Sequence, residues 1–485
     1  MTTMVARDAG TDDAEAITEL QRIFELQRSA FIADPYPSAA ERRARLEAIP
    51  AMLIGYRDRI RKALSEDFAV HPEQLSDLVE ILGVAGRAMF GAASLEEWMK
   101  DDDRPVDPGV FGTGRAMVRY QPKGVIGNIV PWNFPFDLSV GPLVEMLAAG
   151  NRTIIKPSDY TPACANLLRE MITETFDPAQ VAVVVGGVEL AKTFPTLHWD
   201  HLLYTGSPAI GRDVMRAAAE NLVPVTLELG GKCPAIVTTD GLDEEAVRNI
   251  IGVKLLKNGQ MCISVDYVLV PRAEVARFVD IARRVAEETL KGYSTSADCA
   301  GIITERHLDR LLGLLAEAEA SGAEVVTLGG DAGNVDRASR QMPLSLVLDP
   351  SEQIGIMQEE IFGPILPIKP YDSLDEALAW VNAGERPLAL YVFTKDEVVA
   401  DRVLNQTISG GACVNACAMH GAMPSLGFGG SGHSGMGRHH GIEGFREFSN
   451  PKGVFVRGEG DLSAAFYPPY GELANGVVAA ALGGA

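Results

Sequence analysis

Residues 124–156 read GVIGNIVPWNFPFDLSVGPLVEMLAAGNRTIIK, and the fold class follows from their pattern. The short apolar run GVIGNIV predicts a buried strand, VGPLVEMLAAG predicts a helix that stops at Gly150, and TIIK predicts a second strand. The alternation continues with the predicted strands VAVVV, HLLY and VPVTLEL, and with the predicted helices PACANLLREMITETF and IGRDVMRAAAE. Apolar strands that alternate with helices are typical of a parallel sheet covered on both faces.

A second alternating series begins near Cys233. The strands predicted in it are PAIVTT, ISVDYVLV and LALYVFT, and the helices are SLDEALAWVNA and EEAVRNIIGVKLLKN, the latter ending at Gly259. Two successive series predict two α/β domains, each a doubly wound parallel sheet, with a boundary near residue 232. A length of 485 residues agrees with two or three domains.

Three further segments flank these series. Residues 12–98 repeat apolar positions at helical spacing, and the acidic run Asp101–Asp103 before two prolines predicts a solvated linker. Residues 107–121 predict an extended excursion from the main body. The glycine-rich stretch 427–437, GFGGSGHSGMG, predicts a loop whose backbone passes close to the active-site cleft.

The composition excludes several classes of function. The chain has 43 basic and 65 acidic residues, and a net charge of −22 disfavours nucleic acid and anionic membranes as partners. The N-terminal segment has no apolar core of signal-peptide length, and we expect no window with the ~18 apolar residues of a membrane helix. Six scattered cysteines indicate a reducing compartment, so we expect a cytoplasmic protein.

Three residues have the chemistry of a catalytic site. Cys262, in NGQMCIS, lies between a predicted helix and a strand, where a thiol can face a cleft, although an isolated cysteine is usually an inert core residue. Glu228 ends the strand VPVTLEL, where a carboxylate is costly unless it is paired or functional; a solvated strand end is the alternative. Asn133, in PWNFP, is an amide on a stiff proline loop that suits an oxyanion donor, although turn asparagines are common.

Two further segments suit a nucleotide. Gly206 and Gly211, in YTGSPAIG, fit a phosphate near a helix N-terminus, although the pattern is not the dinucleotide fingerprint. Lys156 ends the predicted strand TIIK, and Asp159 lies in the turn after it. The two side chains can hold a ribose and a phosphate, but a solvated charged turn explains them equally well.

The combination of motifs resembles one family. NGQMC, LELGGK, PWNFP, IIKPS, TGSPAIG and EEIFGP together are similar to the NAD(P)-dependent aldehyde dehydrogenase superfamily, over about residues 12–470. The steps of 34 residues from Glu228 to Cys262 and of 98 from Cys262 to Glu360 also resemble that family. The segments PPYG and GMGRHHG look most like its class 3 and coniferyl aldehyde dehydrogenase branch.

The resemblance implies a role for each matching residue. Cys262 is the expected nucleophile, Glu228 the general base, and Asn133 the oxyanion donor together with the Cys262 backbone N–H. These roles imply oxidation of an aldehyde to an acid through a thioester that water hydrolyses, and the presence of Glu228 favours water over a CoA thiol. The cofactor is expected to be NAD or NADP, bound by Trp132, Lys156, Asp159, Gly206, Ser207, Gly211, Glu360 and Phe362.

The resemblance also implies a division of the chain. Residues 1–106 and 122–232 would form the cofactor-binding domain, to which residues 427–450 return, and residues 233–426 the catalytic domain. Residues 107–121 and 451–458 would form a small oligomerisation β-segment, and residues 459–485 a C-terminal tail. Because such a segment exposes a sheet edge, we expect a homodimer.

Two departures from the family pattern leave questions open. Asp159 stands where the family often has glutamate, so the choice between NAD and NADP is undecided. Cys413, Cys417 and His420 have a spacing that suggests metal ligands, but a fourth ligand at suitable spacing is lacking. We therefore expect no metal, and small residues packed beside the substrate entrance.

The substrate is expected to be a small-molecule aldehyde, aromatic or otherwise bulky and apolar. Trp132, Phe134 and Phe136 flank Asn133, and we expect their rings to line an apolar tunnel. Two alternatives remain: a non-catalytic member of the same fold, and a thiol hydrolase or acyltransferase that uses Cys262 without a cofactor. The three intact catalytic side chains disfavour the first, and the set of cofactor motifs disfavours the second.

Overall fold

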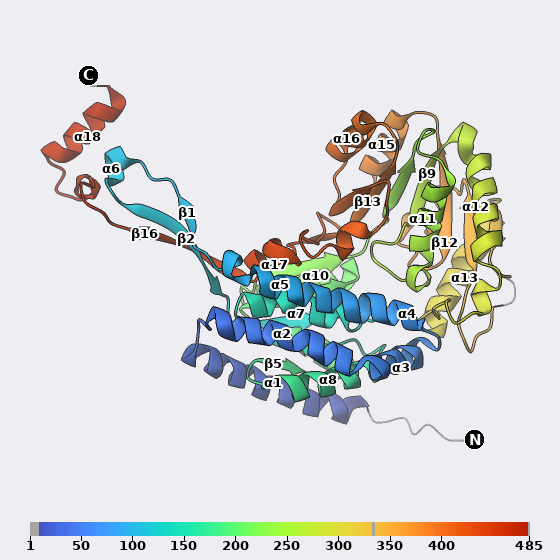
Figure 1. Ribbon diagram of the computed structural model, residues 1–485, viewed down its shortest axis with the longest axis horizontal. Helices are drawn as coiled ribbons and strands as arrows, with labels where there is room; N and C mark the ends of the chain where they lie inside the picture. Colours follow the sequence, from blue (N-terminus) through green and yellow to red (C-terminus); the bar gives the residue numbers. More distant parts are fainter. Residues whose placement is uncertain (1–8, 332–334, 484–485) are drawn as a thin grey trace.

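The two predicted series form two separate sheets, and a third, smaller sheet extends away from them as an arm (Figure 1). The computed structural model describes residues 9–331 and 335–483, so the first eight residues of the segment inspected for a signal peptide lie outside the described part. The predicted α/β class with parallel sheets is confirmed. Both large sheets also contain one antiparallel strand at an edge, which the sequence pattern did not predict.

The first sheet has six strands in the order β15-β7-β6-β3-β4-β5. Its strands are β3 (Val125–Ile129), β4 (Arg152–Lys156), β5 (Val181–Val183), β6 (His201–Gly206), β7 (Val225–Leu229) and β15 (Gly435–Met436). Neighbouring residues of β3 belong to different apolar clusters: Val125 packs on one face of the sheet and Ile126 on the other. This is why the strands read as continuous apolar runs.

Helices cover both faces of this sheet. They are α1 (Ala9–Ala33), α2 (Ala39–Gly55), α3 (Arg57–Phe68), α4 (Glu73–Leu75), α5 (Val84–Trp98), α7 (Asp137–Ala148), α8 (Pro162–Thr175), α9 (Val188–Thr193), α10 (Pro208–Ala219) and α17 (Gly441–Glu447). A π-helix, η1 (Ser76–Gly83), joins α4 to α5, and a 3-10 turn, η2 (Phe194–Thr196), follows α9. Helix α7 is buried on nearly all sides because α2 and α5 pack against it.

The second sheet has seven strands in the order β10-β11-β12-β9-β8-β13-β14. They are β8 (Pro234–Val237), β9 (Tyr267–Pro271), β10 (Glu324–Leu328), β11 (Leu344–Leu348), β12 (Ile365–Tyr371), β13 (Ala389–Phe393) and β14 (Gly411–Val414). The helices are α11 (Glu244–Leu255), α12 (Val275–Thr289), α13 (Glu305–Ala320), α14 (Gly355–Gln358), α15 (Leu374–Ala383) and α16 (Glu397–Gln406), with 3-10 turns η3 (Leu256–Gly259), η4 (Arg272–Glu274), η5 (Tyr293–Thr295) and η6 (Met419–Ala422). The chain changes sheets between Leu229 and Pro234.

The arm is a three-stranded antiparallel sheet that carries the C-terminal helix at its far end (Figure 1). It consists of β1 (Asp102–Arg104), β2 (Arg115–Pro122) and β16 (Ser449–Val456), with α6 (Pro108–Phe111), η7 (Ser463–Phe466) and α18 (Glu472–Leu482). The predicted linker at Asp101–Asp103 is wrong, because Asp102 and Asp103 pair with Val118 and Met117 of β2. The run of acidic residues is typical of a solvated linker, but β1 is an edge strand, and edge strands also expose charged side chains to water.

One helical stretch, Glu73–Trp98, is long and apolar enough to cross a membrane by length and composition alone. Half of its most apolar window is buried inside the protein, and a core helix meets the same criteria. The expectation that no such window exists is therefore wrong as stated. Two charged residues of this stretch, Glu80 and Arg87, are buried in ion pairs with Lys257 and Glu145, which is how a core helix accommodates them.

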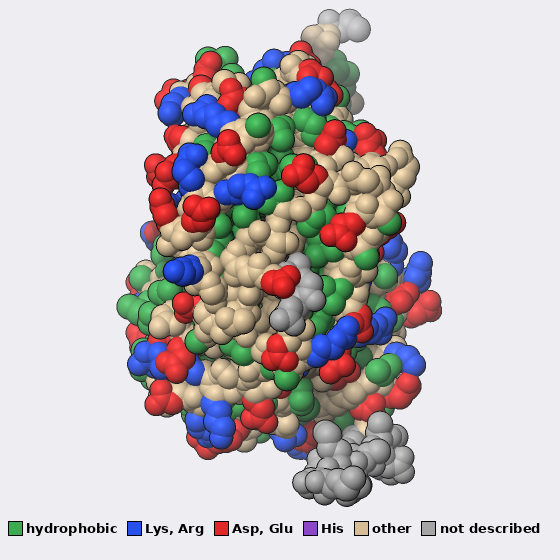
Figure 2. Space-filling model, turned by 90° about the vertical axis from the view of Figure 1, so that its right-hand side faces the viewer, with side chains coloured by type: hydrophobic (Ala, Val, Ile, Leu, Met, Phe, Trp, Pro, Cys, Tyr) green, Lys and Arg blue, Asp and Glu red, His purple; other side chains and the backbone are tan. Residues whose placement is uncertain are grey.

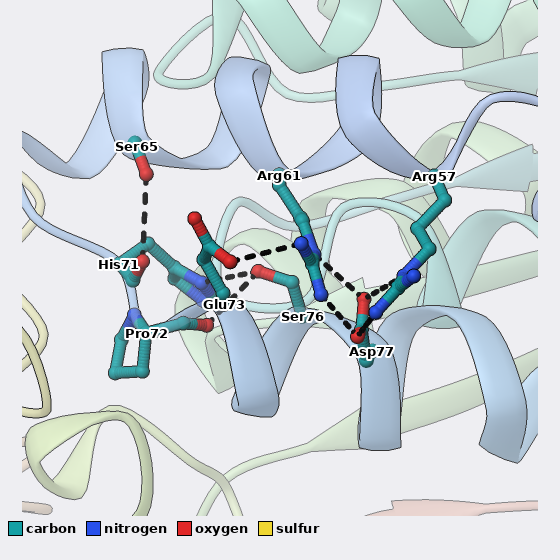
Figure 3. A network of polar contacts seen from close by, with 8 residues as sticks. All are labelled: Arg57, Arg61, Ser65, His71, Pro72, Glu73, Ser76 and Asp77. Atoms are coloured by element: carbon teal, nitrogen blue, oxygen red, sulfur yellow. Dashed lines mark hydrogen bonds and ion pairs between the residues drawn. The ribbon is translucent and has the colours of Figure 1, made fainter.

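A polar network fixes the start of this stretch against α3 (Figure 3). Arg57 and Arg61 both donate from Nε to the Asp77 carboxylate, at 3.0 and 2.9 Å, and the two guanidinium groups hold the pKa of that carboxyl well below its usual range. Behind them, the Ser76 hydroxyl donates to the Pro72 carbonyl at 3.1 Å. The network holds η1, which contributes Leu78 and Val79 to the cavity described below.

Charged side chains of both signs are interspersed on the face seen in Figure 2. The net charge of −22 is therefore not gathered there into a single acidic surface. Apolar side chains appear between the charges in small groups, which is normal for a protein surface.

Candidate active site

One cavity of about 470 Å³ joins the carboxyl ends of the first sheet to the loop that follows η3. This volume lies within the range of ordinary small-molecule sites. The predicted site residues that line it are Trp132, Asn133, Gly206, Ser207, Glu228, Cys262, Glu360 and Phe362. The other three predicted residues, Lys156, Asp159 and Gly211, do not line it. The structure therefore brings the three predicted catalytic side chains together.

Cys262 is partly exposed to the cavity, and a strained run of backbone precedes it. Lys257 and Asn258 have φ values of 50° and 54°, which are unfavourable for residues other than glycine. The Asn258 side-chain amide stabilises this conformation by donating to the carbonyls of Ala300 and Met342, at 3.2 and 3.1 Å. The run reverses the chain between α11 and β9, and so places the cysteine at the cavity wall.

The pKa of the Cys262 thiol is raised. Burial is the largest cause, and the carboxyl groups of Glu360 and Glu228 act in the same direction. The backbone N–H groups of Cys262 and Ile263 oppose the shift because they donate toward the sulfur. Negative charge on either neighbouring carboxyl group therefore disfavours the thiolate, in addition to the effect of burial.

Asn133 lies on the loop after β3 and is almost fully buried. Its side-chain nitrogen donates to the Gln260 carbonyl at 3.3 Å, two residues before Cys262. A primary amide has two N–H groups, so this contact leaves one donor for a ligand. The amide is thus held against the nucleophile loop, which suits a preorganised donor.

Glu228 is buried on β7, and neither carboxyl oxygen has a hydrogen-bond partner among the described residues. Burial raises the pKa of this carboxyl well above its usual range, and Arg438 only partly opposes the shift. The glycine-rich loop packs directly against it: a Cβ on Gly429 would lie 2.8 Å from Glu228 Oε1, and Gly435 pairs with Glu228 across the sheet edge. The predicted close passage of this loop is confirmed.

The carboxyl group of Glu360 packs directly against Gly230. A Cβ on Gly230 would lie 2.0 Å from Glu360 Oε2, so the first glycine of LELGGK makes room for this carboxyl group. Burial is the main cause that raises the pKa of Glu360, to about 8, while the Gly231 backbone N–H lowers it. Phe362 follows with a φ of 53° and packs edge-on to Trp132, with ring centroids 5.4 Å apart.

Several of the residues predicted to bind the cofactor carry donor groups that suit a nucleotide. Helix α10 starts after Ser207, whose side chain makes no capping hydrogen bond, so the exposed N-terminus of the helix keeps free N–H groups for a phosphate. Lys156 Nζ is buried and donates to the Pro157 carbonyl at 3.1 Å, which leaves two N–H donors for a hydroxyl group. Asp159 is exposed nearby. Gly211 lies inside α10, where an added Cβ would meet Leu229 Cδ2 at 2.8 Å, so its role there is helix packing.

The predicted entrance segment lies beside the cavity. Cys413 Sγ lies 3.3 Å from His420 Nδ1, Cys417 is buried, and the neighbouring Ala418 and Met419 line the cavity. Within residues 9–331 and 335–483, no three His, Cys, Asp or Glu side chains are grouped as metal ligands would be.

Of the predicted aromatic lining, Trp132 and Phe134 contribute to the cavity. Phe136 does not line the cavity. It is fully buried in the apolar core, so the expectation for this ring is wrong. The reason is its place at the start of α7, where the side chain turns toward the helices that cover the sheet.

The family model described as "Aldehyde dehydrogenase family" matches residues 13–454, almost the whole chain. The chain belongs to the aldehyde dehydrogenase family. It is 41% identical over 455 residues to a probable coniferyl aldehyde dehydrogenase of Caulobacter vibrioides, covering 93% of this chain and 94% of that protein. It is 39% identical over 443 residues to the coniferyl aldehyde dehydrogenase of Pseudomonas sp. strain HR199, covering 91% and 92%.

Solved structures of this family share the fold. A substrate-bound Staphylococcus aureus AldH superimposes with a TM-score of 0.88 at 33% identity, covering 95% of this chain and 99% of that one. A Mycobacterium tuberculosis aldehyde dehydrogenase complexed with NAD+ superimposes with a TM-score of 0.80 at 31% identity, covering 89% of each chain. This aldehyde dehydrogenase accordingly oxidises aldehydes with NAD or NADP.

An ion pair that no sequence motif indicated connects two loops of the aldehyde dehydrogenase site. Glu80 Oε1 accepts from Lys257 Nζ at 2.9 Å, and both side chains are fully buried. Glu80 Oε2 accepts from the backbone N–H groups of Phe136 and Asp137, at 3.0 and 2.9 Å. One carboxylate thus connects the loop of Asn133 to the strained run before Cys262. A carboxylate inside the apolar stretch LVEILGVAG was the available signal.

Glu80→Ala is expected to lower the free energy of unfolding by about 3–5 kcal/mol, because it leaves Lys257 charged, buried and unpaired. Urea unfolding followed by circular dichroism measures this loss. The double variant Glu80→Ala with Lys257→Met should recover much of it, since no buried charge remains. If the free energy of unfolding of Glu80→Ala alone lay within about 1 kcal/mol of the parent value, the ion pair would not have the stabilising role assigned to it.

Proposed function

We propose that this aldehyde dehydrogenase oxidises a bulky, apolar, preferably aromatic aldehyde to the carboxylic acid through a thioester on Cys262. The observation that carries this proposal is that Cys262, Asn133 and Glu228 line one cavity, whose walls are mostly apolar. The unit around the first sheet holds the cofactor, and the unit around the second sheet contributes the nucleophile. The arm, formed by residues 107–121 and 451–458 together with β1, serves assembly.

The first half of the proposed reaction forms the thioester. The Cys262 thiol releases its proton to water, the sulfur attacks the aldehyde carbon, and the carbonyl oxygen becomes an oxyanion held by the Asn133 amide and the Cys262 backbone N–H. Bound NAD(P)+ supplies the hydride acceptor, and we assign Trp132, Lys156, Asp159, Gly206, Ser207, Glu360 and Phe362 to holding it. Loss of the hydride from the substrate carbon restores the carbonyl, now bonded to sulfur.

The second half releases the acid. Glu228 takes a proton from a water molecule, whose oxygen attacks the thioester carbon, and the carbon–sulfur bond breaks. The proton returns to the sulfur, and the carboxylic acid leaves. The raised pKa of Glu228 suits this step, because a carboxylate with a raised pKa removes a proton from water more readily than an ordinary carboxylate does.

The mouth of the cavity supports a bulky apolar substrate. Leu78 and Met419 line it and remain 64% and 46% exposed, and Met423 and Leu426 are exposed on the same entrance segment. Exposed apolar side chains gathered at a cavity mouth favour ligands that bury them. The names of the coniferyl aldehyde dehydrogenases to which this chain is similar point to the same substrate class.

An aldehyde panel tests the proposal. We expect kcat/KM to be about 10-fold or more higher for coniferaldehyde and benzaldehyde than for acetaldehyde, because burial contributes ~25 cal/mol per Å² of apolar surface. Coniferaldehyde, benzaldehyde, hexanal, succinic semialdehyde and acetaldehyde are each assayed with NAD and with NADP. A clear preference for acetaldehyde or for the charged semialdehyde would overturn the substrate class.

The same panel separates the alternatives. A non-catalytic protein would bind nucleotide without oxidising any aldehyde. A cofactor-independent thiol hydrolase would turn over p-nitrophenyl esters but neither bind nor reduce nucleotide. The comparison of NAD with NADP also determines which of the two cofactors the enzyme prefers, a choice that the exposed Asp159 does not decide.

We further propose that the protein forms a homodimer through the arm. Strand β16 is an edge of the arm sheet, and its Phe455 and Val456 are 48% exposed. A long edge with exposed apolar residues is a surface that needs a partner strand. Sedimentation velocity at micromolar concentration should give about twice the chain mass of 51.9 kDa. Monomers alone at that concentration would refute the assignment.

A further inference from the structure

A second polar group lines the cavity, separate from the side chains that surround Cys262. It consists of Arg87, Asp137, His439 and His440. The charges that act on the Cys262 thiol come from Glu360 and Glu228, whereas those that act on Asp137 come from Arg87, Glu80, Lys257 and Glu145. The proposed reaction uses none of the four residues, so their place in the wall of an apolar cavity needs another explanation.

The positive charges near Asp137 are already engaged elsewhere. Arg87 donates from Nε to Glu145 Oε1 at 2.9 Å and forms a buried ion pair with that carboxylate. Two of its other N–H groups face His440 Nε2 at 2.9 Å and His439 Nδ1 at 3.3 Å. Lys257 is paired with Glu80. Among the described residues, no hydrogen bond or ion pair therefore reaches the Asp137 carboxylate.

The Asp137 side chain remains partly exposed at the cavity wall, and its position is fixed. Its backbone N–H donates to Glu80 Oε2 at 2.9 Å, at the first turn of α7. Burial is the main cause that raises the pKa of the carboxyl, to about 7, and Arg87 opposes the shift. A fixed carboxyl group without a protein partner, inside a ligand cavity, is suited to accept a hydrogen bond from the ligand.

The two histidines contact the guanidinium group of Arg87 rather than Asp137. A guanidinium group only donates, so His440 Nε2 and His439 Nδ1 must accept, and the other nitrogen of each neutral ring carries the proton. Those nitrogens, His440 Nδ1 and His439 Nε2, have no partner among the described residues.

We propose that Asp137 forms a subsite that accepts a hydrogen bond from a hydroxyl group on the aldehyde substrate, so that hydroxylated aromatic aldehydes are preferred over their ethers. The subsite rests on the proposed function of the cavity as the aldehyde site. A hydroxyl group donates to Asp137, whereas an ether can only accept.

The geometry disfavours a cationic group as the occupant. A Cβ on Gly141 would lie 2.8 Å from Arg87 Nη1 and 3.5 Å from Asp137 Oδ1, so both groups border the same small space. An ammonium group at Asp137 would therefore lie beside a guanidinium of the same charge. A neutral hydroxyl group meets no such repulsion.

The test compares coniferaldehyde with 3,4-dimethoxycinnamaldehyde, which differs by one methyl group on the phenolic oxygen. The parent enzyme should show a higher kcat/KM for coniferaldehyde by about 10-fold, the effect of one buried hydrogen bond. Asp137→Leu should reduce this preference to about 2-fold or less, and Asp137→Asn should keep part of it, because the amide oxygen still accepts. Activity on benzaldehyde, which has no hydroxyl group, should change little in either variant.

Asp401→Leu is the matched control, because Asp401 is an exposed carboxylate on α16 outside the cavity. It should keep the parent preference. Equal rates for the two cinnamaldehydes in the parent enzyme, or an unchanged preference in Asp137→Leu, would overturn the subsite while leaving the aldehyde assignment intact. A selective loss of activity on 4-trimethylammoniobutanal in Asp137→Leu would overturn it in favour of a cation site. Failure of the parent enzyme on every aromatic aldehyde would instead refute the proposed function.

Discussion

Cys262→Ala should abolish aldehyde oxidation, lowering kcat by ~10⁴-fold or more, while the variant still binds nucleotide. The reason lies in the covalent step: alanine offers no atom that can hold the substrate carbon while the hydride leaves. The fold should tolerate the change, because the groups that donate toward the sulfur are the nearby backbone N–H groups of Cys262 and Ile263, and the strained run before it is held by Asn258.

NAD(P)H formation at 340 nm and nucleotide titration by intrinsic fluorescence measure the two parts of this prediction. Cys413→Ala is the matched control, because Cys413 is the other partly exposed cysteine of the described chain and lies beside the same cavity. Its activity should stay within about 3-fold of the parent enzyme, in line with an ordinary substitution outside the reacting atoms. Substantial turnover by purified Cys262→Ala would end the nucleophile assignment.

Glu228→Gln should preserve the first, stoichiometric release of NAD(P)H but lower steady turnover by about 10²–10⁴-fold. Thioester formation consumes no water, whereas hydrolysis needs a base to remove a proton from it. Glutamine has nearly the same shape and uncharged state as the protonated, buried carboxyl, so the site should remain intact.

Stopped-flow absorbance separates the initial burst from the steady rate. Because the pKa of Glu228 is raised, the carboxylate form is populated only as pH rises through that elevated value, so the steady rate of the parent enzyme should increase as pH rises through it. The variant should lose this increase. Glu287→Gln, an exposed position on α12, is the control. Loss of burst and turnover together would mean that Glu228 serves thioester formation or folding instead.

The sequence allowed prediction of the two sheets and of the central site because both depend on local signals. Strands β3, β6 and β7 are mostly apolar, and Asn133, Ser207 and Glu228 come from the carboxyl ends of these strands or the turns after them. The carboxyl ends of neighbouring parallel strands meet at one edge, so residues of this kind can be expected to converge. Cys262 could be added from the motif and its spacing.

The residues that escaped prediction depend on contacts distant in sequence. Glu80 lies in an apolar helix, and only the fold shows that it pairs with Lys257, 177 positions away. Asp137 looks like an ordinary first-turn acid of a helix, and its lack of partners appears only when Arg87 is seen bound to Glu145. Strand β1 was mistaken for a linker because its charge hid its pairing with β2.

The arm also determines an order of events during synthesis. Pro122 at the end of β2 pairs with Ser449 at the start of β16, so 327 residues (449 − 122) separate the partners. Strand β2 leaves the ribosome early and must wait, with one edge unpaired, until both large units have emerged. Closing so long a loop is slow, and an unpaired edge attracts other chains during that time. We therefore expect this segment to fold last and nascent chains that end before residue 449 to be the form most prone to aggregation, even though both larger sheets are by then complete.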